Sequence, residues 1–153
     1  MTRDQVIALL DARDPIAAAA GLAPPREINW TRGVPTQLGA AVVHYGAGTT
    51  HEEIADRLLA LTGESGLTAV ALVPADDSAD RPGSWGVEDL LVTAVARRVL
   101  PDGVAIRNDW QRLGAAACQA GASFGATEWC IPADDDSDPD HLAEAIGARA
   151  VAR

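Results

Sequence analysis

Four times along this chain, a short run of apolar residues is followed by a turn and then by a longer stretch with apolar residues at helical spacing. The apolar runs, at residues 38–45, 67–73, 104–107 and 127–131, have the length and composition of β-strands. The stretches that follow, at residues 50–61, 86–100, 109–122 and 139–146, have the spacing of amphipathic helices. Strands that alternate with helices are typical of a parallel sheet. The pattern predicts the α/β class and, more specifically, a partial (β/α) barrel of about four units.

The residues before the first unit predict a short helical segment. Residues 5–12 and 15–20 have the composition of two short helices. Residues 26–35 show no clear period, so we expect them to cross the surface or to cover one end of the sheet. The tail at 148–153 fits either a short strand or a frayed end. We predict a single domain over residues 1–153, with the helical segment at 1–33 and the four units at 34–153.

Charge and composition exclude several classes of protein. The chain has 22 acidic and 12 basic residues and a formal net charge of −10, which excludes a nucleic-acid partner because binding nucleic acid needs a basic surface. No stretch approaches the roughly 20 apolar residues of a membrane span, and the N-terminus lacks the pattern of a signal peptide. The two cysteines fit a reducing compartment. We expect a cytoplasmic protein with no membrane or nucleic-acid partner.

Candidate site residues gather where the predicted strands end, because functional groups of β/α barrels lie at the carboxyl ends of the strands. The ligand-binding candidates are His44, Tyr45, Asp76, Asp77, Asn108, Asp109 and Trp129, and the catalytic candidates are His44 and Cys130. Each also has a structural interpretation. Asn108 and Asp109 fit helix caps, Trp129 fits a core position, and Cys130 fits a small buried apolar residue.

Two acidic clusters allow two interpretations. The first includes Asp76 and Asp77, and the second runs from Asp134 to Asp140. They fit solvated turn residues, or a divalent cation site made of oxygen ligands. The spacing matches no calcium loop, and the three histidines match no ligand motif. We predict no metal and no cofactor.

Several segments of the chain resemble one enzyme family. They include residues 34–36, 43–46 with 50–59, and 89–97; the most specific is Asp109-Trp110-Gln111-Arg112-Leu113-Gly114, followed by Gln119 and residues 124–126. These segments resemble the C-terminal part of the radical S-adenosylmethionine enzymes of the futalosine route to menaquinone. That family includes aminofutalosine synthase and dehypoxanthinyl futalosine cyclase. The resemblance implies a barrel-like fold, a place in menaquinone biosynthesis and a nucleoside-like ligand.

The chemistry of that family is missing from this chain. Its iron–sulfur cluster needs three closely spaced cysteines, and this chain has only Cys118 and Cys130, twelve positions apart. Ala47 and Thr49 stand where relatives have histidine and glutamate. We therefore predict a cluster-free half-barrel that binds a ligand or has a regulatory or accessory role, without radical activity. The alternatives are an enzyme with a new acid–base or cysteine site, and a structural partner of a full-length radical enzyme.

The predicted half-barrel favours self-association. An open four-stranded sheet leaves two unpaired edges and one uncovered face, and pairing two copies would bury them. We therefore predict a homodimer. If two copies closed a barrel, Cys130 on the fourth predicted strand would approach the partner subunit's His44, which would permit a thiol–imidazole site across the interface.

Overall fold

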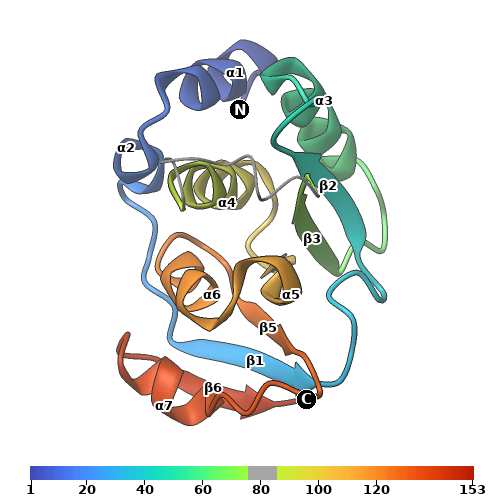
Figure 1. The fold of residues 1–153 in the computed structure, drawn as a ribbon. Helices are drawn as coiled ribbons and strands as arrows, with labels where there is room; N and C mark the ends of the chain where they lie inside the picture. The colour runs from blue at the N-terminus through green and yellow to red at the C-terminus, as the bar shows by residue number, and fades with distance from the viewer. Residues whose placement is uncertain (76–85) are drawn as a thin grey trace.

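The computed structural model describes residues 1–75 and 86–153, in which six parallel strands form one open sheet beside a layer of helices (Figure 1). The helices are α1 (Arg3–Ala12), α2 (Pro15–Ala19), α3 (His51–Thr62), α4 (Val87–Val99), α5 (Trp110–Leu113), α6 (Ala115–Ala122) and α7 (Pro139–Glu144). The strands are β1 (Glu27–Arg32), β2 (Ala41–Tyr45), β3 (Ala69–Pro74), β4 (Ala105–Asn108), β5 (Glu128–Ile131) and β6 (Arg149–Ala152). Their order in the sheet is β2-β3-β4-β5-β1-β6.

The α/β class and the parallel sheet are confirmed. The four predicted strands correspond to β2, β3, β4 and β5, and Thr50 and Asp138 cap α3 and α7 as their positions indicate. The predicted helix at 109–122 is divided into α5 and α6 at Gly114, whose φ of 85° is incompatible with a helix. The finer prediction, a half-barrel of four units, is not confirmed, because two further strands join the sheet and the sheet does not close.

The prediction for residues 26–35 is wrong. Most of this segment is β1, which lies inside the sheet between β5 and β6 rather than across one end of it. The tail at 148–153, for which the sequence left two possibilities, forms the edge strand β6. The N-terminal helices form as expected, and they pack against α3 and α4 (Figure 1).

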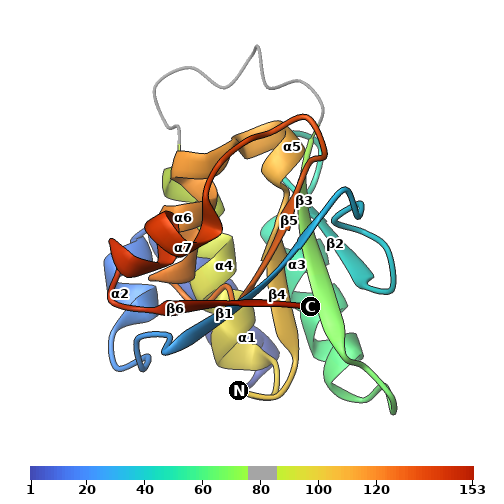
Figure 2. The ribbon, with the colours of Figure 1, turned by 90° about the horizontal axis from the view of Figure 1, so that it is seen from below.

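The two faces of the sheet differ because successive residues of a strand point to opposite sides. On one face, large apolar residues pack under the helices; Val70 and Leu72 of β3, Ile106 of β4 and Trp129 of β5 are examples. In Figure 2, α4, α6 and α7 lie to one side of β3, β4 and β5. The other face carries the intervening residues, which include Ala71 and Val73 of β3, Arg107 of β4 and Glu128 of β5.

That second face is crossed by residues 33–40, which join β1 to β2 and which we call the strap (Figure 1). The helical connections all run across the sheet in one direction, and parallel crossovers are right-handed, so they share one face. The strap runs back in the opposite direction and therefore lies on the opposite face. Parallel crossovers usually need about a dozen residues or more, and the strap has eight, so it crosses without a helix.

Candidate functional site

The chain changes direction across the sheet between the neighbouring strands β5 and β1. The segment after β1 is the strap, which passes to the polar face, whereas the segment after β5 passes to the helical face and leads into α7. In open α/β sheets, ligands bind in the crevice that opens where two such connections diverge at the carboxyl ends of adjacent strands. The strand order therefore predicts a ligand crevice between the carboxyl ends of β5 and β1.

A crevice of about 230 Å³ lies at this point. Its walls come from the strap, from the segment after β5 and from α5: Gly33, Val34, Pro35, Thr36, Gln111, Cys130, Pro132, Ala133 and Asp134. A second hollow, of about 490 Å³, shares Gln111, Pro132 and Asp134 with it and extends toward Asp135 and Asp136. We call the first hollow the switch-point crevice. It offers a ligand a thiol, a hydroxyl, an amide and a carboxylate.

The loop at residues 132–138, which forms one wall, is fixed by its own polar contacts. The Trp110 indole Nε1 donates to Asp135 Oδ2 at 2.7 Å, and the Ser137 backbone N–H donates to Oδ1 at 2.8 Å. The Ser137 hydroxyl, the Trp110 indole and the Ser137 N–H together hold the pKa of Asp135 below its ordinary value of 3.8. On the other side, Arg32 donates to the carbonyls of Asp135 and Ser137. The wall is therefore anchored to β1 and to α5.

Cys130 lies at the base of the crevice and is 3% exposed. Burial raises the pKa of its thiol; the side chain of Thr31, its neighbour on β1, acts in the opposite direction to a smaller extent. A nucleophilic cysteine needs a lowered pKa. The raised pKa favours the neutral thiol, so the burial of Cys130 gives no support to a nucleophilic role.

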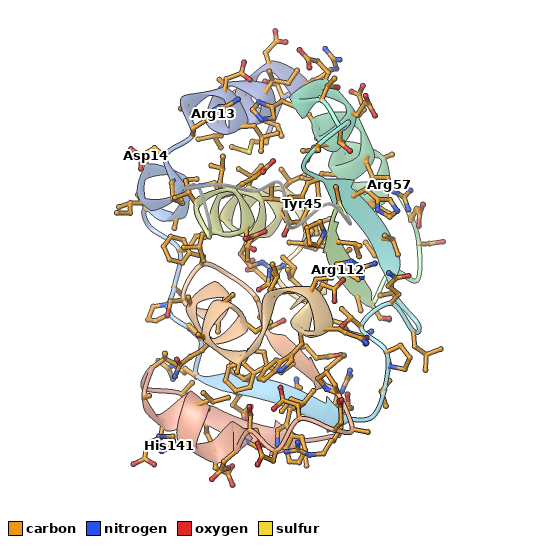
Figure 3. All side chains as sticks on the ribbon, viewed as in Figure 1. Arg13, Asp14, Tyr45, Arg57, Arg112 and His141 are labelled. Carbon is orange, nitrogen blue, oxygen red and sulfur yellow. The ribbon has the colours of Figure 1, made fainter. Side chains whose placement is uncertain are left out.

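A separate polar cluster lies under the helices, at the ends of β2 and β4. The Tyr45 hydroxyl donates to Asp89 Oδ1, Thr93 Oγ1 donates to the Asp89 carbonyl, and Asn108 Nδ2 donates to Thr93 Oγ1 at 2.9 Å. Asn108 Oδ1 is buried and has no hydrogen-bond partner among the described residues. Tyr45 lies beside α4 (Figure 3). These side chains are buried and pack against the core, and within residues 1–75 and 86–153 none of them lines the two hollows described above.

A further hollow, of about 310 Å³, lies beside the starts of α3 and α4. Its lining includes Arg13, His51 and Glu88, so charges of both signs face it. The His51 ring is already paired with Asp11, with 2.6 Å between Nδ1 and Oδ1. Arg13 ends α1, at the upper left of Figure 3. Among the described residues that line this hollow, no arrangement indicates one ligand chemistry.

Of the predicted site residues, Tyr45 and Asn108 share the polar cluster, and the others do not join them in one site. His44 is exposed on β2 and Cys130 is on β5, three strand spacings or about 14 Å away across the sheet. Trp129 points into the helical face, where its indole donates to the Cys118 carbonyl at 3.2 Å. Asp109 caps α5 and pairs with Arg112 at 2.6 Å. Asp76 and Asp77 lie outside the described residues.

The proposed approach of Cys130 to the partner subunit's His44 is inconsistent with the strand order. It requires the strand of Cys130 to be at an edge of the sheet, and β5 lies between β4 and β1. The unpaired edges belong to β2 and β6. The thiol–imidazole site across a closed barrel is therefore not available in this fold.

Sequence reasoning missed most of the crevice. Thr36 and Gln111 line it and were not candidates, whereas Asp134 was considered only as part of an acidic cluster after a predicted strand. Asp134 belongs to an acidic cluster that the sequence does reveal. Within residues 1–75 and 86–153, no three His, Cys, Asp or Glu side chains come close enough to hold a metal ion, so the cluster gives no support to a cation site. In the same part of the chain, no helix has the length and hydrophobicity to span a bilayer.

Comparisons with protein-family models, with curated proteins and with solved structures found no match to this chain. The segments that resemble the futalosine-pathway enzymes therefore gain no support from them. The candidate function is therefore inferred from the geometry of the sheet and of the switch-point crevice.

Proposed function

We propose that this protein binds a small uncharged or cationic molecule in the switch-point crevice, without an iron–sulfur cluster and without radical chemistry. The observation that carries this proposal is the coincidence of the crevice with the point where the connections after β5 and β1 diverge. Ligand sites of open α/β sheets concentrate at such points.

The charges around the crevice support the ligand class. Among the described lining residues, the ionised side chain is Asp134, with Asp135 and Asp136 in the adjoining hollow. The guanidinium of Arg32, on β1, is occupied by two loop carbonyls. A phosphorylated ligand would be repelled by these carboxylates, whereas hydroxyl or amino groups of a ligand would find acceptors. A nucleoside without phosphate, the ligand that the family resemblance implies, belongs to this class.

The strand order supports the finer interpretation of a barrel fragment. In a (β/α) barrel successive strands are neighbours, and β2, β3, β4 and β5 are neighbours in chain order here. The two cysteines support the absence of a cluster: Cys118 is buried under the helices, whereas Cys130 lies on the strap face. The homodimer stays a prediction. Its original argument is weaker, because the strap already covers part of the face that was expected to need a partner.

Thermal shift and calorimetry with adenosine, inosine and guanosine test the proposal. The matched variants are Ala133→Trp, which places an indole in the crevice, and Ala17→Trp on α2; both alanines are exposed. We expect at least one nucleoside to raise the melting temperature of the wild type and of Ala17→Trp. The Ala133→Trp protein should lose this shift.

The 5′-monophosphates of the same nucleosides test the ligand class. They should bind more weakly than the nucleosides, by about tenfold or more if one carboxylate near the phosphate costs about 1.4 kcal/mol. Tighter binding of the monophosphates would contradict the ligand class. Equal shifts in Ala133→Trp and the wild type would contradict the location, and no shift with any nucleoside would remove the nucleoside from the proposal.

A further inference from the structure

The strap is attached to the sheet by few contacts. The Gly33 N–H donates to the Ile131 carbonyl at 2.8 Å, where the strap leaves β1. Beyond that point, the backbone hydrogen bonds that the structure describes are internal to the strap, from Leu38 to Pro35 and from Ala40 to Gln37. The strap is thus folded on itself as two turns and lies across the sheet without joining its ladder.

One side chain fastens the middle of the strap. Arg107 Nη1 donates to the Thr36 carbonyl at 3.0 Å and to the Leu38 carbonyl at 2.7 Å. The same guanidinium is held by Glu128, with 2.6 Å between Nε and Oε1, and the second oxygen of Glu128 accepts from Arg153 at 2.7 Å. Arg107 is 7% exposed and Glu128 is 1% exposed. The guanidinium therefore joins the strap to two strands of the sheet.

Two glycines allow the strap to bend near its ends. Gly33 has a φ of 81° and Gly39 a φ of 71°, in the left-handed region that other residues adopt only at a cost. Space around Gly39 is open, since a Cβ there would meet nothing within 4 Å. The strap thus has a fastening in its middle, between two residues that tolerate a change of backbone direction.

The strap and the crevice share residues. Residues 33–36 form one wall, and Cys130 lies at the base. If the middle of the strap left the sheet, the wall would move with it and Cys130 would become accessible. Cys118, in contrast, is 1% exposed and belongs to α6, which lies in the helical layer on the other side of the sheet from the strap.

We propose that the strap is a hinged gate over the switch-point crevice, fastened by Arg107 and able to open while the helical face stays folded. Its use in admitting a ligand rests on the proposed function. The opening itself does not, and it is measured without any ligand. The two cysteines report it, because one lies beneath the gate and the other is in the helical layer.

Native-state thiol labelling, with each cysteine followed by mass spectrometry, tests the gate. In the wild type we expect Cys130 to react with a bulky maleimide faster than Cys118, and with a rate that low denaturant concentrations leave unchanged. Equal rates at the two cysteines would show that only global unfolding exposes Cys130, and would overturn the proposal.

Gly39→Ala tests the hinge without changing any charge. The closed strap would force alanine into a left-handed conformation, so labelling of Cys130 should accelerate by roughly five- to thirtyfold, with Cys118 unchanged. Gly66→Ala is the matched control, because Gly66 has a φ of 81°, open space around it and a position after α3, away from the strap. Equal effects of the two substitutions on Cys130 would overturn the hinge.

The double variant Arg107→Met with Glu128→Leu tests the fastening. It removes both hydrogen bonds to the strap and leaves no unpaired charge between the two positions. Cys130 should then label at least tenfold faster while Cys118 keeps its wild-type rate. An unchanged Cys130 rate would show that Arg107 does not hold the gate, whatever the nucleoside experiments show.

Discussion

The two faces of the sheet are built from the same strands and covered in opposite ways. On the helical face, Val70, Leu72, Ile106 and Ile131 pack against helices that fill the space with side-chain volume. On the strap face, a loop of eight residues lies over small side chains and one buried ion pair. The helical face is stabilised by many non-directional contacts, whereas the cover of the strap face is fastened by a few directional ones.

This difference has a consequence for dynamics and function. Apolar packing weakens gradually as contacts are lost, because each contact contributes little. The middle of the strap, in contrast, is held by the hydrogen bonds of one guanidinium, so it is either attached to the sheet or detached from it. Local opening is therefore expected on the strap face, and the switch-point crevice lies at the border of that face. Binding sites commonly use the less stable parts of a fold in this way.

Breaking the ion pair should have the largest effect. Glu128→Ala leaves the buried Arg107 with carbonyl partners only, and removal of one member of a buried pair lowers the free energy of unfolding by about 3–5 kcal/mol. Urea denaturation followed by circular dichroism measures the change. A loss below about 1 kcal/mol would show that the strap face does not depend on the pair.

On the helical face, the close approach of α6 to β4 should have the next largest effect. A Cβ on Gly121 of α6 would overlap Asn108 Oδ1 of β4, and Asn108 is 4% exposed, with little room to move. Gly121→Ala should lower the free energy of unfolding by about 1–3 kcal/mol, the usual cost of overpacking. Labelling of Cys118, which requires unfolding of the helical layer, should accelerate accordingly, whereas the labelling rate of Cys130 should stay as in the wild type.

A double-mutant cycle identifies the cause of that loss. Asn108→Ala removes the side chain that the new methyl group would meet, so the double variant should lose less stability than the two single losses added together. If the stability losses of the two single variants simply add in the double variant, Gly121 is required for another reason, such as the backbone conformation of α6.

The difference between the two faces also explains which strands could be predicted from the sequence. The helical face produces local signals, since each strand and helix repeats its apolar residues within a few positions; β2 to β5 were found for this reason. β1 was missed although Ile28 and Trp30 alternate with Asn29 and Thr31 in a two-residue period. Its place between β5 and β6 depends on pairing with residues about 100 positions away, which no local pattern records.

The candidate site was predicted less well for the same reason. The carboxyl ends of β2 to β5 were located to within one residue, and Cys130 near the end of β5 does line the crevice. The opposite wall belongs to the strap, which was not placed from the sequence. One available signal was not used: Arg107 and Glu128 are opposite charges within apolar strands. Such residues are seldom buried without a partner, and this pair would have indicated a polar face on the sheet.

The smallest expected effect concerns the loop wall and its dependence on pH. Hydrogen bonds from Ser137 and Trp110 depress the pKa of Asp135 in the folded state. The resulting stabilisation is therefore present above the ordinary aspartate value of 3.8 and is lost as the pH falls through the lower folded-state value.

Nuclear magnetic resonance of the Trp110 indole N–H should show it hydrogen-bonded at pH 5 and released only below pH 3.8. Trp110→Phe should raise the pKa of Asp135 toward its ordinary value, whereas Trp30→Phe, on β1, should leave it unchanged. A pKa at or above 3.8 in the wild type would show that the wall is not fixed through Asp135, and the contrast between an anchored wall and a movable strap would then disappear.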